Sequence, residues 1–132
     1  MLTFLNDEPG AESVEDLLQK AENTKISVSM SIINMLEVYY DRIKTGKELE
    51  VQRFIDFMQT APIKIINSIS DFVYHEAARL KASYKIALAD AIGLANAREL
   101  SGQFVTSDHA ELEDVEQHEP ICFLWLPAKP KK

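Results

Sequence analysis

The stretch Leu88–Thr106, LADAIGLANARELSGQFVT, decides the fold class of this chain. Its first part is a run of small and apolar residues, which predicts a buried helix over Leu88–Leu100. Gly102 follows as the expected C-cap of that helix, and Gln103–Thr106 has the apolar, β-branched character of a short strand. A helix that leads through a glycine into a strand is typical of α/β proteins.

The same alternation extends along the chain in both directions. The sequence predicts helices over Ala11–Glu22, Ile32–Ile43, Lys47–Gln59 and, after the N-cap Ser70, through Tyr84, with further strands at Ile26–Ser29, Ile63–Ile66 and Ile121–Leu124. We therefore expect an α/β domain with a mainly parallel sheet covered on both faces. Residues 1–127 would form this single domain, and residues 128–132 would be a basic tail.

Composition and charge exclude several classes of protein. With 132 residues, 14 of them basic and 21 acidic, the chain has a net charge of −7, which argues against a basic surface that grips nucleic acid. No run of about 18 apolar residues is present, so we expect no membrane span. The acidic N-terminus is not typical of a signal peptide. The single cysteine, Cys122, cannot form an internal disulfide, which fits a cytoplasmic protein.

Glu37 lies on a strongly periodic helix. Its apolar residues are spaced to form one face, which we expect to be core or interface: Ile32, Met35, Leu36, Tyr39, Tyr40 and Ile43. The neighbours of Glu37 one turn away are Ile33 and Tyr40, so we expect its carboxylate to border the buried face. A carboxylate there needs a cation or several donors, and an ordinary ion pair with Arg or Lys explains it as well as a functional site does.

Asp90 and Asp108 lie on either side of the predicted strand Gln103–Thr106. Ligands of open α/β sheets bind beyond the carboxyl ends of the strands. Asp90 is the only charge between Ile86 and Ala97, although a first-turn Asp that interacts with the helix dipole would need no function. Asp108 comes just after the strand that ends at Thr106, where an Asp is most often a turn former. If the three carboxylates converge, their mutual repulsion favours a bound hard cation such as Mg²⁺ or Mn²⁺, which supports hydrolysis of a phosphodiester.

Four segments resemble the PIN-domain ribonucleases, and within them the VapC toxins of toxin–antitoxin pairs. These segments are Phe4–Glu12 (FLNDEPGAE), Ser29–Tyr40 (SMSIINMLEVYY), Leu88–Ala95 (LADAIGLA) and Val105–His109 (VTSDH). The resemblance implies a Rossmann-like PIN fold and a Mg²⁺- or Mn²⁺-dependent endoribonuclease. It also implies inhibition by a VapB-like antitoxin and assembly as a homodimer or larger oligomer.

The resemblance assigns roles to residues by position. Glu37, Asp90 and Asp108 would be catalytic metal ligands, Thr106 a supporting or water-orienting hydroxyl, and Asn34 an amide that orients the site or lies on the helix surface. The family opens with a central strand that ends in a first acidic ligand, and this chain begins after that point. We therefore expect three of the four acids, an absent first central strand and exposed strand edges that favour association.

Two other functions compete with the nuclease. A catalytically lapsed PIN module would act by binding the antitoxin or a second copy of itself. A phospho-acceptor receiver domain would need a paired acidic cluster after its first strand and a lysine near the end of its last strand, and the sequence has neither. The charge of −7 remains compatible with a weakly held RNA strand, because a bound cation inverts the local potential toward phosphate.

Overall fold

The computed structural model describes residues 11–23, 26–46, 48–106 and 109–125. The chain alternates helices and short strands and divides into two compact units, Met1–Ile66 and Asn67–Lys132. The first motif of the family resemblance, residue Asp108 and the predicted basic tail lie wholly or largely outside the described residues. None of the described helices is long and apolar enough to cross a membrane.

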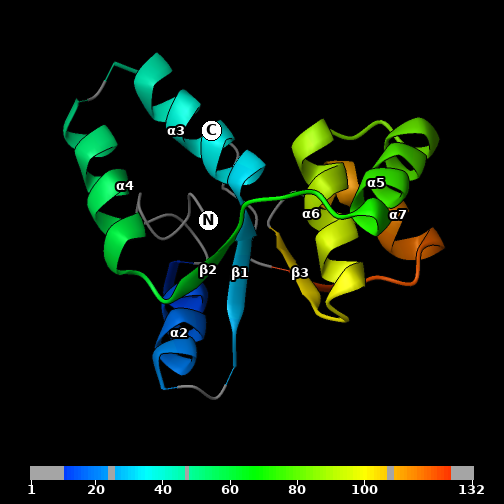
Figure 1. Ribbon diagram of the computed structural model, residues 1–132, viewed down its shortest axis with the longest axis horizontal. Coiled ribbons are helices and arrows are strands. Elements are labelled where there is room, and N and C mark those ends of the chain that lie inside the picture. Colours follow the sequence, from blue (N-terminus) through cyan, green and yellow to red (C-terminus); the bar gives the residue numbers. More distant parts are fainter. Residues whose placement is uncertain (1–10, 24–25, 47, 107–108, 126–132) are drawn as a thin grey trace. The chain divides into compact units, whose positions relative to one another are not determined.

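The first unit is built around two parallel strands. Its elements are α2 (Ala11–Glu22), β1 (Val28–Ser31), α3 (Ile32–Lys44), α4 (Glu48–Thr60) and β2 (Ile63–Ile66) (Figure 1). β1 pairs with β2 in parallel, with Val28 opposite Ile63 and Ser31 opposite Ile66. The core of this unit is formed by Met30, Val38 and Phe54, with Met35, Met58 and Ile63 packed against it.

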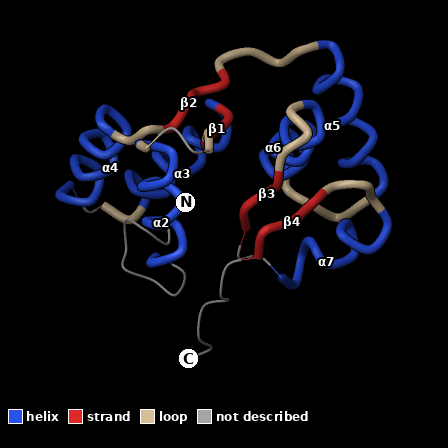
Figure 2. Tube along the Cα trace, turned by 90° about the horizontal axis from the view of Figure 1, so that it is seen from below, coloured by secondary structure: helices blue, strands red, loops and turns tan. Residues whose placement is uncertain are grey.

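The second unit repeats the pattern with a second parallel pair. Its elements are α5 (Asp71–Ser83), α6 (Leu88–Glu99), β3 (Gln103–Thr106), α7 (His109–His118) and β4 (Cys122–Trp125). β3 and β4 run side by side, with Gln103 opposite Cys122 and Thr106 opposite Trp125 (Figure 2). Its fully buried side chains come from three helices: Val73, Leu80, Leu94, Leu112 and Val115.

The predicted α/β class with parallel strands is confirmed, and within the described residues the strands form two sheets of two strands each. Three of the predicted strands differ little from the structure, but the first begins at Val28 instead of Ile26. It extends to Ser31 because that residue is the N-cap of α3, where its hydroxyl accepts a hydrogen bond from the Ile33 N–H at 3.1 Å. The last strand is Cys122–Trp125, one residue later than expected.

The end of α6 is not formed by Gly102 as predicted. The left-handed residue is Ser101, with φ of 53°, directly after the C-cap Leu100. The Gly102 N–H donates to the Ala97 carbonyl at 2.9 Å and the Ser101 N–H to the Arg98 carbonyl at 3.2 Å, which is the Schellman pattern. The glycine was expected at the left-handed position, but it lies one residue beyond it. By contrast, the left-handed residue after α3 is a glycine, Gly46, with φ of 71°.

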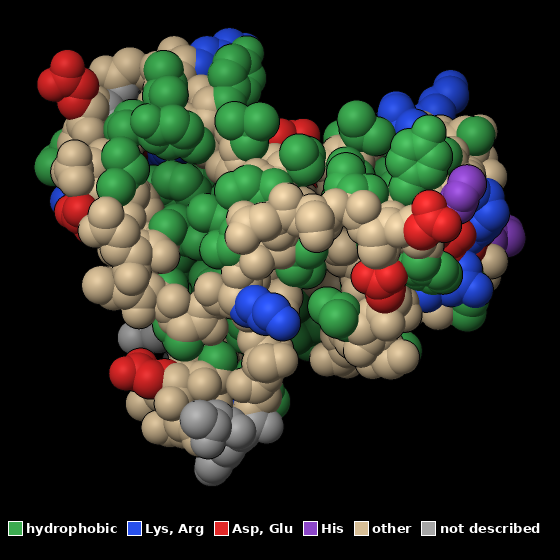
Figure 3. Space-filling model, viewed as in Figure 1, with side chains coloured by type: hydrophobic (Ala, Val, Ile, Leu, Met, Phe, Trp, Pro, Cys, Tyr) green, Lys and Arg blue, Asp and Glu red, His purple; other side chains and the backbone are tan. Residues whose placement is uncertain are grey.

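Of the two interpretations of the apolar stripe of α3, core or interface, the core interpretation fails for most of its length. Leu36, Tyr40 and Ile43 are each more than half exposed. The residues that α3 buries are Val38 and Arg42, and Arg42 Nη1 donates to Glu50 Oε2 of α4 at 3.1 Å. Hydrophobic side chains accordingly gather at the surface over α3 and α4 (Figure 3). A strong helical periodicity thus marks a face that needs a partner, without showing that the partner is the chain's own core.

Candidate functional site

Asp90 lies in the first turn of α6, where packing holds the backbone in place. The N-cap of the helix is Ala87, so Asp90 is its third residue, and its side chain is half-buried. Its neighbours Ala89 and Ala91 are almost completely buried, and so are most residues further along the helix. Small side chains let α6 pack closely against α5, and this fixes the place from which the Asp90 carboxylate projects.

The strand that follows α6 ends at the second predicted site residue of this unit. Thr106 is the last residue of β3 and is half-buried. It lies opposite Trp125, the last residue of β4, so both strands end at the same edge of the sheet. This is the carboxyl edge, where ligands bind in open α/β sheets. Asp108 follows within two residues, outside the described part of the chain.

Glu111 joins this region although it belongs to the acidic run of residues 111–116, a composition typical of a solvated helix face. Glu113 and Asp114 are exposed, as such a face requires. Glu111 is half-buried, and its Oε1 accepts a hydrogen bond from the Ala87 N–H at 3.0 Å. The bond joins the first turn of α7 to the start of α6, the helix that carries Asp90. The sequence alone does not single out Glu111 from the neighbouring acids, because the burial of Leu112 beside it is decided by the fold.

Glu37 and Asn34 belong to the first unit, on α3. Glu37 is exposed, and so is its neighbour Tyr40, so the expectation that this carboxylate borders a buried apolar face is wrong. Asn34 is half-buried, and its Oδ1 is buried without a hydrogen-bond partner among the described residues. An unpaired buried amide oxygen carries a desolvation cost of about 1–3 kcal/mol, which distinguishes Asn34 from an ordinary surface amide.

Among the described residues, no group of three or more His, Cys, Asp or Glu side chains is placed to hold a metal ion. The structure brings Asp90, the end of β3 at Thr106 and Glu111 into the same unit. The roles of Glu37, Asp90, Asp108, Thr106 and Asn34 stay predictions.

The strongest electrostatic feature lies elsewhere, on the packed helices of the second unit. Glu76 of α5 is almost completely buried, and its carboxylate accepts hydrogen bonds from Arg79 at 2.7 and 3.1 Å and pairs with Arg98 of α6. Hydrogen bonding from Arg79, more than the pairing with Arg98, holds the pKa of Glu76 below its usual value, against the opposing effect of burial. The pairing of Glu76 with Arg98 therefore links α5 to the C-terminal end of α6, the helix that carries Asp90.

The same arginine continues the network to α7. Arg79 Nη2 donates to Glu119 Oε1 at 2.6 Å, and the Tyr84 hydroxyl donates to Glu119 Oε2 at 2.7 Å. The bond from Arg79 lowers the pKa of Glu119, and the bond to Glu119 raises the pKa of Tyr84 to about 12. These bonds connect α5, α6 and Glu119, the residue that directly follows α7, and we call this network the brace.

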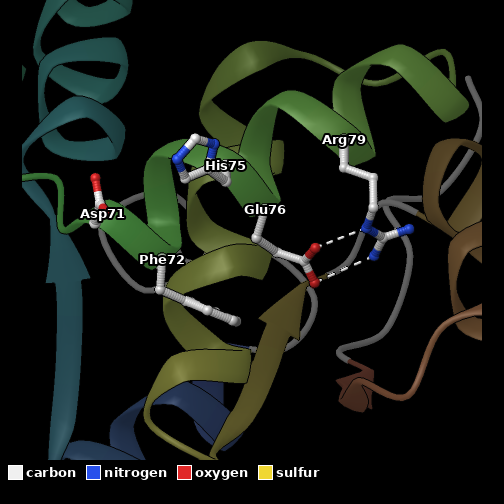
Figure 4. Close-up of a pocket in the computed structure, with 5 residues that line it drawn as sticks. All are labelled: Asp71, Phe72, His75, Glu76 and Arg79. Atoms are coloured by element: carbon white, nitrogen blue, oxygen red, sulfur yellow. Dashed lines mark hydrogen bonds and ion pairs between the residues drawn. The ribbon is translucent and has the colours of Figure 1, made fainter.

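A surface pocket lies along α5 beside this brace (Figure 4). Its lining residues all come from that one helix: Asp71, Phe72, His75, Glu76 and Arg79. The two charged side chains at its end, Glu76 and Arg79, face each other and pair, as the dashed lines show. None of the predicted site residues lines the pocket, so it does not mark the predicted metal site.

The model of the PIN domain family matches residues 1–117. Among solved structures, the chain is similar to a toxin–antitoxin complex from Klebsiella pneumoniae, with 27% identity and a TM-score of 0.50, over 64% of this chain and 65% of that one. The match thus spans less than two thirds of the Klebsiella chain.

A second solved structure matches over nearly the full length. It is VapBC2 from Rickettsia felis bound to a DNA fragment from their promoter, with a TM-score of 0.71 and 17% identity, over 95% of this chain and 92% of that one. This likeness is one of fold. No curated protein matches the sequence.

Proposed function

The chain belongs to the PIN domain family, and from that premise we propose that it is the endoribonuclease toxin of a toxin–antitoxin pair. The observation that carries the proposal is the match of the family model to residues 1–117, which include Asp90 in the first turn of the buried helix α6. The likeness to a toxin–antitoxin complex from Klebsiella pneumoniae supports the toxin assignment. The partner would be a small VapB-like antitoxin in the cytoplasm.

The side chains of the proposed site fit a hard divalent cation by their donor chemistry. Asp90 offers carboxylate oxygen from the first turn of α6, and oxygen-only ligand sets select Mg²⁺ or Mn²⁺ over softer metals. Asp108 and Glu37 would complete the set. When bound, such an ion activates water and stabilises the charge that develops on the phosphate.

The residues of the chain itself would position the substrate and the nucleophile. The Thr106 hydroxyl, at the carboxyl edge of the sheet, would orient the attacking water by hydrogen bonding. The carboxylate of Asp90 would hold its place because the first turn of α6 is fixed by the buried Ala89 and Ala91. Asn34 would use its unpaired amide oxygen to orient the neighbouring groups.

The decisive variant of this proposal is Asp90→Asn, which keeps the size of the side chain and removes its charge. We expect the full chain to cleave single-stranded RNA with Mg²⁺ or Mn²⁺ and the variant to lose at least about 100-fold in rate. Cleavage is measured on a labelled oligonucleotide, with the exposed Asp114→Asn as the matched control. Equal activity of Asp90→Asn and Asp114→Asn would remove Asp90 from the reaction.

A second candidate function is a PIN module that has lost catalysis and acts by binding. The observation that favours it is the exposed apolar stripe on α3, with Leu36, Tyr40 and Ile43 each more than half exposed. Such a face fits an antitoxin helix or a second copy of the chain, so a homodimer or larger assembly is expected. A wild-type chain that binds its antitoxin but cleaves no RNA with either metal would favour this function over the nuclease.

A further inference from the structure

We propose that Glu111 is a positioning residue for Asp90. It holds the N-terminus of α6 from the neighbouring helix α7. The effect on cleavage rests on the proposed function, whereas the fixing of the α6 N-terminus by Glu111 does not. Its basis is the hydrogen bond from the Ala87 N–H to Glu111 Oε1 at 3.0 Å, between residues 24 positions apart in the sequence.

The start of α6 lacks the cap that helices usually carry. Its N-cap residue is Ala87, whose side chain makes no capping hydrogen bond. The first N–H groups of a helix have no partner within it, and Ser, Thr, Asp or Asn at the N-cap normally supplies one. Two other helices illustrate the usual solution, since Ser31 caps α3 and Ser70 caps α5 with their hydroxyls.

Glu111 takes a role that a residue of the helix itself would take in a capping box. In that motif the acid at the third helical position reaches back to the N–H of the N-cap residue. The third position of α6 is Asp90, and the N–H in question is that of Ala87, which donates to Glu111 instead. The acceptor is thus supplied in trans, by α7, which leaves capping of this N–H independent of Asp90.

The position of Glu111 is itself fixed by packing. Leu112 and Val115 of α7 are completely buried, so the register of α7 on the rest of the unit is set by these two side chains. Glu111 directly precedes Leu112, in the first turn of α7. Glu111 therefore ties the first turn of α7 to the start of α6, the helix that carries Asp90.

The test compares Glu111→Ala, Glu111→Gln and the exposed control Glu113→Ala in the full chain. Gln keeps an acceptor oxygen for the Ala87 N–H, whereas Ala removes it. We expect Glu111→Ala to lose about 10- to 100-fold in kcat for RNA cleavage, as is usual for groups that orient a metal ligand. We expect Glu111→Gln to recover most of that loss and Glu113→Ala to match the wild type.

Amide hydrogen exchange at residues 87–91 gives a readout that does not depend on activity. Glu111→Ala should speed exchange at Ala87 at least several-fold, and the other two variants should not. Unchanged exchange at Ala87 in Glu111→Ala would overturn the positioning role, whether or not the wild type cleaves RNA. If the wild type is inactive but Ala87 responds, the proposed function fails and the cap stands. If Glu111→Gln is as inactive as Glu111→Ala in an active protein, Glu111 acts through its charge and the proposal is wrong.

Discussion

Helices α3 and α6 have opposite relations between sequence pattern and burial. α3 carries a strong apolar periodicity, yet Leu36, Tyr40 and Ile43 are exposed. α6 has little amphipathic character, since its own small and apolar residues occur on all of its sides, yet seven of its residues are buried. The comparison teaches that periodicity identifies a helix and one of its faces, whereas the identity of the partner depends on what the rest of the chain offers.

The largest expected effect tests this contrast directly. Leu94 of α6 is completely buried and Leu36 of α3 is 58% exposed. Leu94→Ala should destabilise the protein by about 3 kcal/mol through lost burial and a residual cavity, and Leu36→Ala by less than about 0.5 kcal/mol. Urea unfolding followed by circular dichroism measures both. A loss at Leu36 as large as that at Leu94 would mean that the α3 face is covered in solution.

A second contrast is between the buried brace of the second unit and an exposed ion pair of the first. Arg79→Met removes one partner each of Glu76 and Glu119, whose side chains are only 7% and 8% exposed and which keep Arg98 and Tyr84, and we expect a loss of about 2 kcal/mol. Lys20→Met removes the exposed pair with Asp16 and should cost less than about 0.5 kcal/mol. Unfolding midpoints measure the loss of stability in both variants. Nearly equal losses would mean that the ion pairs of Arg79 are well solvated.

The brace also predicts an acid dependence of stability. Hydrogen bonding from Arg79 lowers the folded-state pKa of both Glu76 and Glu119. The stabilisation is therefore complete above the unfolded-state pKa of glutamate, about 4.3, and is lost as the pH falls through the lower folded-state values. Unfolding midpoints measured from pH 7 to pH 3 should decline more steeply for the wild type than for Arg79→Met. Parallel profiles would contradict this assignment.

The smallest expected effect concerns the two helix ends. Gly46 after α3 and Ser101 after α6 both have positive φ, and only the first is a glycine. Ser101→Gly should stabilise the protein by about 0.5–1 kcal/mol, whereas Gly46→Ala should destabilise it by about 1 kcal/mol. A Cβ at Gly46 would meet no other atom within 4 Å, so its cost is conformational. Thermal unfolding measures both, and Ser101→Ala is the control for loss of the hydroxyl.

The fold class could be predicted because alternation is a local property. β-branched strands, the N-cap Ser70 and the periodic helices each depend on a few neighbouring residues, and the structure confirms them. The site could be predicted only in part. Asp90 stood out as a charge in an apolar helix, but Glu111 was hidden among the acids of residues 111–116. Its partner, Ala87, lies 24 residues away.

The sequence by itself determined the helices and strands, their order and the family to which the chain belongs, since these follow from local patterns and motifs. Only the tertiary structure decided which apolar face is buried, which residue takes the left-handed position after α6, and which acid caps that helix. Local preferences act within about one turn of helix, whereas burial and the partners of polar groups depend on segments that meet after folding. Glu111 shows the difference, because its carboxylate acquires a role only where α7 packs beside α6.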